Sequence, residues 1–99
     1  MILRELLQRL DYTVVQGSID VAVTELVFDS RKAVPGCVFV ALSGSRADGH
    51  AYIPQVVEKG AAVIVGERPI EVPSHVTYLQ VENGRVALAE LSAAYFGYP

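Results

Sequence analysis

The hydrophobic positions along the chain change between helical spacing and short continuous runs. Near the start, apolar residues recur at intervals of three and four, with charged and polar residues between them: Ile2, Leu3, Leu6, Leu7 and Leu10. This spacing predicts an amphipathic helix over residues 2–10. Two β-prone segments follow, at residues 12–16 and 21–28, and Gly17-Ser18 separates them. Each is expected to form a strand.

The middle of the chain has the pattern of a strand, a helix and a second strand. After a turn at Pro35-Gly36, the run "CVFVAL" (residues 37–42) is apolar throughout, as is typical of a strand covered on both faces. We expect it to be a central strand. Residues 43–50 form a loop, helical spacing resumes at Tyr52 and ends at Gly60, and "AAVIV" predicts the second strand.

The last third of the chain completes an α/β pattern. A proline-punctuated segment at residues 68–74 leads to a predicted strand at 76–81. Asn83 is expected to cap a final helix that runs to about Phe96. The order of elements predicts a mixed, largely parallel sheet flanked by helices. The length of 99 residues suits one domain spanning residues 1–99.

Composition narrows the classes of partner. The formal charge is -3 and the eight Lys and Arg residues are scattered, so no basic stripe for nucleic acid is present. The single cysteine, Cys37, excludes an internal disulfide, and two distant histidines make a zinc site a poor prediction. These features predict a cytoplasmic chain that binds no metal. No apolar run is long enough to span a bilayer, so no membrane association is expected.

Two polar loops carry the candidate chemistry. Asp29-Ser30-Arg31 follows one predicted strand, and the loop at residues 43–50 follows the next. In an open α/β sheet, ligands bind beyond the carboxyl ends of the strands, so both loops are expected at one edge. They supply hydroxyls, guanidinium groups and backbone N–H groups, which bind anions. The contributing residues are Ser30, Ser43, Ser45, Arg31, Arg46, Gly44 and Gly49.

Structural explanations of the same residues remain open at this point. Asp29 can cap a turn or pair with Arg31, His50 can simply start a helix, and Asp48-Gly49 is a common turn dipeptide. The sequence lacks the P-loop, GxSxG, HExxH and GxGxxG patterns, so no catalytic residue is predicted. The residues therefore favour a binding domain for a small anionic ligand, with a non-enzymatic interaction domain as the alternative.

Linked motifs in one segment resemble a known family. In "FDSRKAVPGCVFVALSGSRADGHAYIPQVVEKGAAVIVGE", a DSR element, a PG turn, an FVA strand and a G-x-x-x-D-G-H loop precede a Gly-Ala element and an apolar strand. In this order they resemble the N-terminal domain of the Mur ligases of peptidoglycan synthesis. The opening "LRELLQRL" and closing "ALAELSAAYFGYP" look more like the ligase that adds a diamino acid than the one that adds D-alanyl-D-alanine.

The resemblance implies a ligand and a set of contacts. This domain of the family holds the UDP end of UDP-N-acetylmuramoyl-L-alanyl-D-glutamate. The remaining domains of the same protein bind ATP and Mg²⁺ and join diaminopimelate or lysine to it.

Carried over by motif, Ser30 would bind the diphosphate, Phe28 would contact the uridine end, and Ser45, Arg46 and Ala47 would embrace the nucleotide. The supporting residues would be Asp29, Arg31, Asp48, Gly49 and His50. Because a carboxylate repels a diphosphate, Asp29 is expected to turn toward backbone N–H groups or Arg31. The isolated domain would be inactive, and the D-alanyl-D-alanine-adding ligase remains the alternative parent enzyme.

Overall fold

The computed structural model describes residues 1–44 and 47–97 of the chain. Five strands form one sheet in the order β1-β5-β4-β3-β2. Strand β1 is antiparallel to its neighbour β5, and the other three pairings are parallel. The predicted mixed, largely parallel sheet is therefore confirmed. The strands are β1 (Thr13–Gln16), β2 (Leu26–Val27), β3 (Val38–Val40), β4 (Val63–Gly66) and β5 (Thr77–Gln80).

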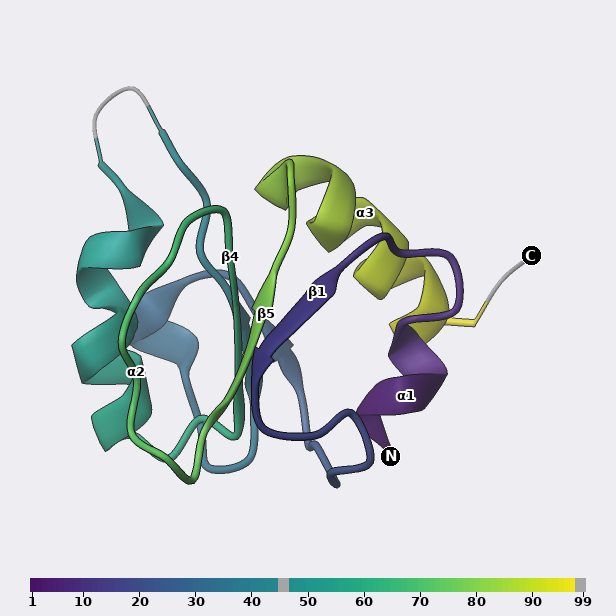
Figure 1. Cartoon of the computed structure of the whole chain (residues 1–99), viewed down its shortest axis with the longest axis horizontal. Coiled ribbons are helices and arrows are strands. Elements are labelled where there is room, and N and C mark those ends of the chain that lie inside the picture. Colours follow the sequence, from purple (N-terminus) through teal and green to yellow (C-terminus); the bar gives the residue numbers. More distant parts are fainter. Residues whose placement is uncertain (45–46, 98–99) are drawn as a thin grey trace.

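Helices cover both faces of this sheet (Figure 1). One side carries α2 (Ile53–Glu58), and the other carries α1 (Leu3–Leu6) and α3 (Gly84–Tyr95). Two 3-10 turns, η1 (Ser30–Lys32) and η2 (Gly49–Tyr52), follow β2 and precede α2 respectively. Asn83 caps α3 as predicted, because its Oδ1 accepts hydrogen bonds from the N–H groups of Arg85 and Val86 at 3.0 and 3.2 Å.

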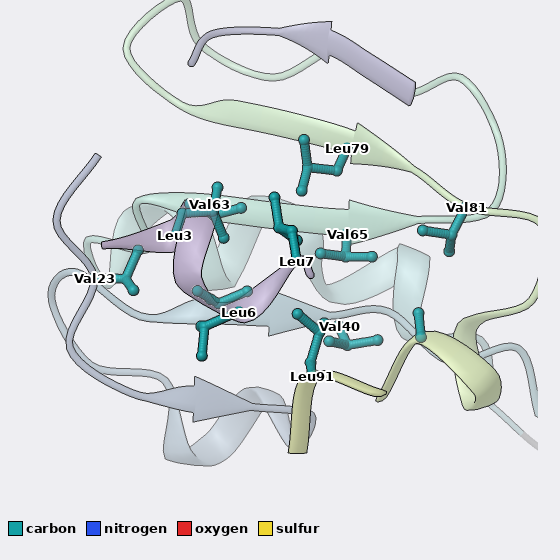
Figure 2. Close-up of a cluster of buried hydrophobic side chains, with 12 residues drawn as sticks. Leu3, Leu6, Leu7, Val23, Val40, Val63, Val65, Leu79, Val81 and Leu91 are labelled. Carbon is teal, nitrogen blue, oxygen red and sulfur yellow. The ribbon is translucent and has the colours of Figure 1, made fainter. Parts of the chain in front are cut away.

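Alternate residues of the inner strands supply two separate cores. Val38 and Val40 of β3 face α1 and α3, whereas Phe39 faces α2, and every residue of β3 is fully buried. In Figure 2, Leu6 of α1, the adjoining Leu7 and Leu91 of α3 pack with Val40, Val63, Val65 and Leu79 of the sheet. Strand β3 is an inner strand covered on both faces, although the middle position belongs to β4. Cys37 is part of the α2-side core, and burial raises the pKa of its thiol.

The first helix is shorter than its apolar spacing predicts. Residues 2–10 were expected to be helical, but α1 ends at Leu6, and the following residues form single turns in which the Leu10 N–H bonds the Leu7 carbonyl at 3.2 Å. Leu3, Leu6 and Leu7 are still buried. A helix continuing to Leu10 would leave only residues 11 and 12 to carry the chain to β1 at the far edge of the sheet.

The strand predicted at residues 21–28 is also shorter, since β2 contains only Leu26 and Val27. The segment before it pairs elsewhere, because Ala22 forms a bridge with Ile2 and the Val23 N–H bonds the Met1 carbonyl at 2.8 Å. The N-terminal segment thus takes hydrogen-bonding groups that the sequence pattern had assigned to the sheet. Among residues 1–44 and 47–97, no helix is long and apolar enough to cross a membrane.

Candidate functional site

The two polar loops meet at one hollow, on the α2 face and beyond the carboxyl ends of β2 and β3. The hollow has a volume of about 610 Å³, within the range of small-molecule pockets. The turn after β2 contributes four residues, the loop after β3 contributes three, and buried Phe39 contributes from within the sheet. The lining residues are Phe28, Asp29, Ser30, Arg31, Phe39, Leu42, Ala47, Gly49, Tyr52 and Gln55. The expectation that both loops open onto one edge is confirmed.

The turn after β2 pairs its acidic residue with a neighbouring arginine. Asp29 Oδ1 accepts hydrogen bonds from the backbone N–H and the Nε of Arg31, both at 3.0 Å, and Oδ2 accepts from Nη2 at 2.8 Å. The Arg31 side chain and backbone N–H lower the pKa of Asp29 to about 2. Asp29 therefore forms the turn in the way the sequence predicted, and its negative charge is paired.

Ser30 lines the hollow, and its carbonyl is used within the fold. Its carbonyl accepts a hydrogen bond from the Ala33 N–H at 3.3 Å and from Lys59 Nζ at 3.0 Å. Within the described parts of the chain, the Ser30 hydroxyl makes no hydrogen bond. Phe28 stands at the rim with 59% of its surface exposed, which leaves an aromatic face open to solvent. A free hydroxyl, an aromatic ring and nearby cations thus border one hollow.

Hydrogen bonds of Asp48 and His50 hold the D-G-H part of the second loop in place. Asp48 Oδ1 accepts the His50 N–H at 3.0 Å and lies 2.7 Å from His50 Nδ1. The backbone N–H of Glu67 donates to His50 Nε2 at 2.9 Å, so the Nδ1 of His50 carries the proton and donates to Asp48. Arg68 Nη2 donates to Asp48 Oδ2, and this guanidinium is the first cause of an Asp48 pKa well below its usual range.

Gly49 is required by close packing in the same loop. A Cβ at this position would lie 2.7 Å from the Leu42 nitrogen, closer than packed atoms approach each other. The Gly49 N–H also donates to the Leu42 carbonyl at 2.8 Å. The loop therefore folds back tightly onto the end of β3, and this brings Ala47 to the hollow.

One sequence prediction for the site needs correction, and others are not tested by the structure. Ser43 was expected among the anion-binding hydroxyls, but its Oγ donates to Glu67 Oε1 at 2.7 Å instead. Asp48 and His50, which were predicted only as supporting residues, hydrogen-bond each other and are not among the residues that line the hollow. Ser45 and Arg46 lie outside the described residues, so their predicted contacts are not tested.

Other residues of the site were not predicted from the sequence. Tyr52 and Gln55 line the hollow from one exposed face of the η2-α2 segment. Their three-residue spacing, offset from buried Ile53 and Val56, was a signal that could have identified them. Glu67 and its neighbour Arg68 gave no such signal, because their roles depend on contacts with the distant residues 43, 48 and 84.

The fold and the hollow together define an α/β domain with a candidate site at the carboxyl ends of parallel strands. Among the described residues, no group of three or more His, Cys, Asp or Glu side chains is placed to hold a metal ion.

Comparison with known proteins identifies the family. The model described as "Mur ligase family, catalytic domain" matches residues 22–96, and the chain belongs to the Mur ligase family. A UDP-N-acetylmuramyl-tripeptide synthetase from Roseiflexus sp. (strain RS-1) is 45% identical over 104 residues, covering 100% of this chain and 20% of its own length. A UDP-N-acetylmuramoyl-L-alanyl-D-glutamate–2,6-diaminopimelate ligase from Clostridium perfringens (strain 13 / Type A) is 37% identical over 99 residues, with the same coverage.

Solved structures agree with this assignment. A crystal structure of MurF from Acinetobacter baumannii matches with a TM-score of 0.79 and 33% identity, covering 94% of this chain and 20% of that one. The predicted resemblance to the N-terminal region of Mur ligases is confirmed. The chain spans about a fifth of the length of the relatives it matches.

Proposed function

We propose that this chain binds the UDP end of UDP-N-acetylmuramoyl-L-alanyl-D-glutamate, as one domain of a ligase that adds a diamino acid. The observation that carries the proposal is the Ser30 hydroxyl, which makes no hydrogen bond within residues 1–44 and 47–97, at a hollow of about 610 Å³ bordered by exposed Phe28. A hydroxyl donates to a diphosphate without the entropic cost of a long side chain, and such charge-assisted hydrogen bonds contribute about 1.5–3 kcal/mol each. The Phe28 ring offers a stacking surface for the uracil base.

The charges around the hollow favour an anionic ligand. Asp29 is the acidic residue of the lining, and its carboxylate is paired with Arg31. The Arg31 side chain remains 87% exposed, and Lys59 lies within hydrogen-bond distance of the Ser30 carbonyl. A diphosphate at Ser30 would therefore meet two cations and no free carboxylate from these neighbours.

The peptide-bond chemistry belongs to other parts of the proposed enzyme. ATP and Mg²⁺ are expected in the full-length ligase, but this sequence has no G-x-x-x-x-G-K-[ST] pattern to hold a nucleoside triphosphate. The 99-residue chain is therefore expected to hydrolyse no ATP. The diamino acid, diaminopimelate or lysine, is also selected outside it.

The D-alanyl-D-alanine-adding ligase is a second candidate parent, because a solved MurF structure shares the fold at a TM-score of 0.79. The curated relatives reported above, at 45% and 37% identity, instead carry the names of tripeptide-forming enzymes. Both candidates share UDP binding by this domain, so the test of that binding is common to them.

Titration of the ¹⁵N-labelled chain with UDP-N-acetylmuramate tests the proposal. Amide signals of residues 28–31 and 47–50 should shift, whereas ATP with Mg²⁺ should leave them in place. A Ser30→Ala variant provides the matched control for the hydroxyl. Absence of shifts with UDP-N-acetylmuramate would favour the interaction-domain alternative, and equal shifts with ATP would contradict the assigned ligand.

A further inference from the structure

Residues that follow β4 anchor the base of the loop at residues 43–49. Glu67 Oε1 accepts the Ser43 hydroxyl at 2.7 Å, and the Glu67 N–H donates to His50 Nε2 at 2.9 Å. Within the loop, its two sides are also joined: Ser43 and Asp48 form an antiparallel bridge, and the Gly44 N–H donates to the Ala47 carbonyl at 3.0 Å. The side chain and the backbone of Glu67 thus contact opposite ends of the loop.

The second carboxylate oxygen of Glu67 reaches a different element. Oε2 accepts the N–H of Gly84, the first residue of α3, at 2.6 Å. A Cβ at Gly84 would lie 3.2 Å from this oxygen and 3.0 Å from the Ala41 carbonyl oxygen, so α3 begins in close contact with this region. One carboxylate therefore links the loop beside the hollow to the helix on the opposite face of the sheet.

Both oxygens of Glu67 are hydrogen-bonded within the fold. Glu67 does not line the hollow, and the Gly84 N–H, followed by the Ser43 hydroxyl, lowers the pKa of its carboxyl. A side chain in this position can affect the contacts of a bound anion through the loop that it holds. Ala47 and Gly49 of that loop do line the hollow.

Resting on the function proposed above, we propose that Glu67 is a positioning residue for the UDP ligand. By holding Ser43 against the start of α3, it sets the place of Ala47 and Gly49 beside the hollow. A purely structural carboxylate would contribute to stability alone. A positioning carboxylate contributes to ligand affinity in a folded protein, and its effect depends on Ser43.

Three variants separate these roles, with Glu71→Ala as the matched control for Glu67→Ala. Glu67→Ala removes both hydrogen bonds, and Ser43→Ala removes the loop side alone. Glu67→Gln keeps both, because its carbonyl can accept from Gly84 while its amide N–H donates to the Ser43 oxygen. Glu71 is exposed and makes no hydrogen bond or ion pair within residues 1–44 and 47–97, so its substitution makes the same chemical change without the contacts.

The affinity for UDP-N-acetylmuramate is measured together with the urea-unfolding midpoint. Glu67→Ala is expected to weaken binding about tenfold in a folded protein, and Glu67→Gln should recover most of that loss. Adding Ser43→Ala to Glu67→Ala should cost little more, because both remove the same link. A change in the midpoint with unchanged affinity would overturn the proposal, as would fully additive losses.

Two further outcomes are covered by the same set. If Glu67→Ala does not fold, Glu67→Gln and Ser43→Ala decide by the affinity they retain: equal affinity in Ser43→Ala and wild type overturns the proposal. If wild type binds no UDP-N-acetylmuramate, the proposed function fails and the role of Glu67 in ligand affinity fails with it. Amide shifts of Ala47 and Gly49 in ligand-free Glu67→Ala, compared with Glu71→Ala, then show separately whether Glu67 positions the loop.

Discussion

Neighbouring residues in the turn after β2 have separate tasks. Asp29 uses its carboxylate within the turn, on the backbone and side chain of Arg31. Ser30 uses its carbonyl within the fold, and its hydroxyl is the group that we propose binds the ligand. The sequence was sufficient to predict that the Asp29 carboxylate bonds within the turn, because a carboxylate facing a diphosphate would be repelled.

Replacement of Ser30 by alanine is expected to weaken binding of UDP-N-acetylmuramate by tenfold to a hundredfold, or about 1–3 kcal/mol. The change removes one donor to the diphosphate and no packed core volume, so the fold should persist. Isothermal titration gives the affinity and circular dichroism checks the fold. Unchanged affinity in a folded variant would remove Ser30 from the site.

The lowered pKa of Asp29 predicts that part of the free energy of unfolding depends on pH in the acid range. Its pKa is about 2 in the folded chain, against an ordinary value of 3.8, so the folded state binds this proton less readily than the unfolded state. The stabilisation is complete above about pH 4 and is lost as the pH falls toward 2. Asp29→Asn keeps a cap for the Arg31 N–H without the charge. The difference in urea-unfolding midpoint between wild type and this variant should shrink over that range, and a constant difference would contradict the prediction.

At the scale of elements, strongly patterned segments were predictable and segments with competing partners were not. The buried strand β3 and the Asn83-capped helix α3 follow from apolar runs and a capping side chain. The shortened α1 does not, since its length depends on where β1 must lie. Likewise β2 loses residues 21–23 to pairing with the N-terminal segment, a long-range contact that local spacing cannot indicate.

The same distinction applies to the candidate site. The two loops were found because each polar segment directly follows an apolar strand, which places both at one edge of a parallel sheet. The inward turn of Ser43 was missed, because its partner Glu67 is distant in sequence. Local patterns thus indicated where the site lies, while long-range hydrogen bonds decided which side chains face it.

The packing of α3 gives a stability prediction for that element. Leu91 is fully buried against the sheet (Figure 2), so Leu91→Ala should lower the free energy of unfolding by about 2–5 kcal/mol. Val86 on the same helix is 56% exposed, and Val86→Ala should change the free energy of unfolding by about 0.5 kcal/mol or less. Urea unfolding of the pair measures both, and similar losses would contradict the buried position of Leu91.

At the scale of the whole chain, two apolar cores enclose both faces of one sheet, which is the condition for independent folding. The 99-residue chain should therefore unfold in one cooperative transition and give a dispersed amide spectrum. Thermal melting followed by circular dichroism, together with the ¹⁵N spectrum, measures this. A gradual melt with collapsed amide signals would show that residues 1–99 depend on other parts of a longer protein.

The affinity of this chain for the ligand should be weak, because the chain spans only part of the length of its relatives. The relatives are about five times longer, since the alignments cover 20% of their length. If the muramoyl-peptide part of the proposed ligand contacts those other regions, its binding energy is lost here. We expect a dissociation constant for UDP-N-acetylmuramate in the high micromolar to millimolar range, about -4 to -6 kcal/mol. Calorimetry measures it, and nanomolar binding would contradict this division of contacts.

The pairing of β1 with β5 joins Thr13 to Gln80, and it constrains how the polypeptide can fold as a ribosome makes it. The sheet cannot gain its antiparallel edge until β5 has emerged from the exit tunnel. Until then Val14 and Val15, which remain 42% and 50% exposed even in the finished fold, belong to a nascent strand with no neighbour. Such edges favour contact with other chains. For this sheet, the interval between translation of residue 16 and residue 80 is the period in which a chaperone would be of most use.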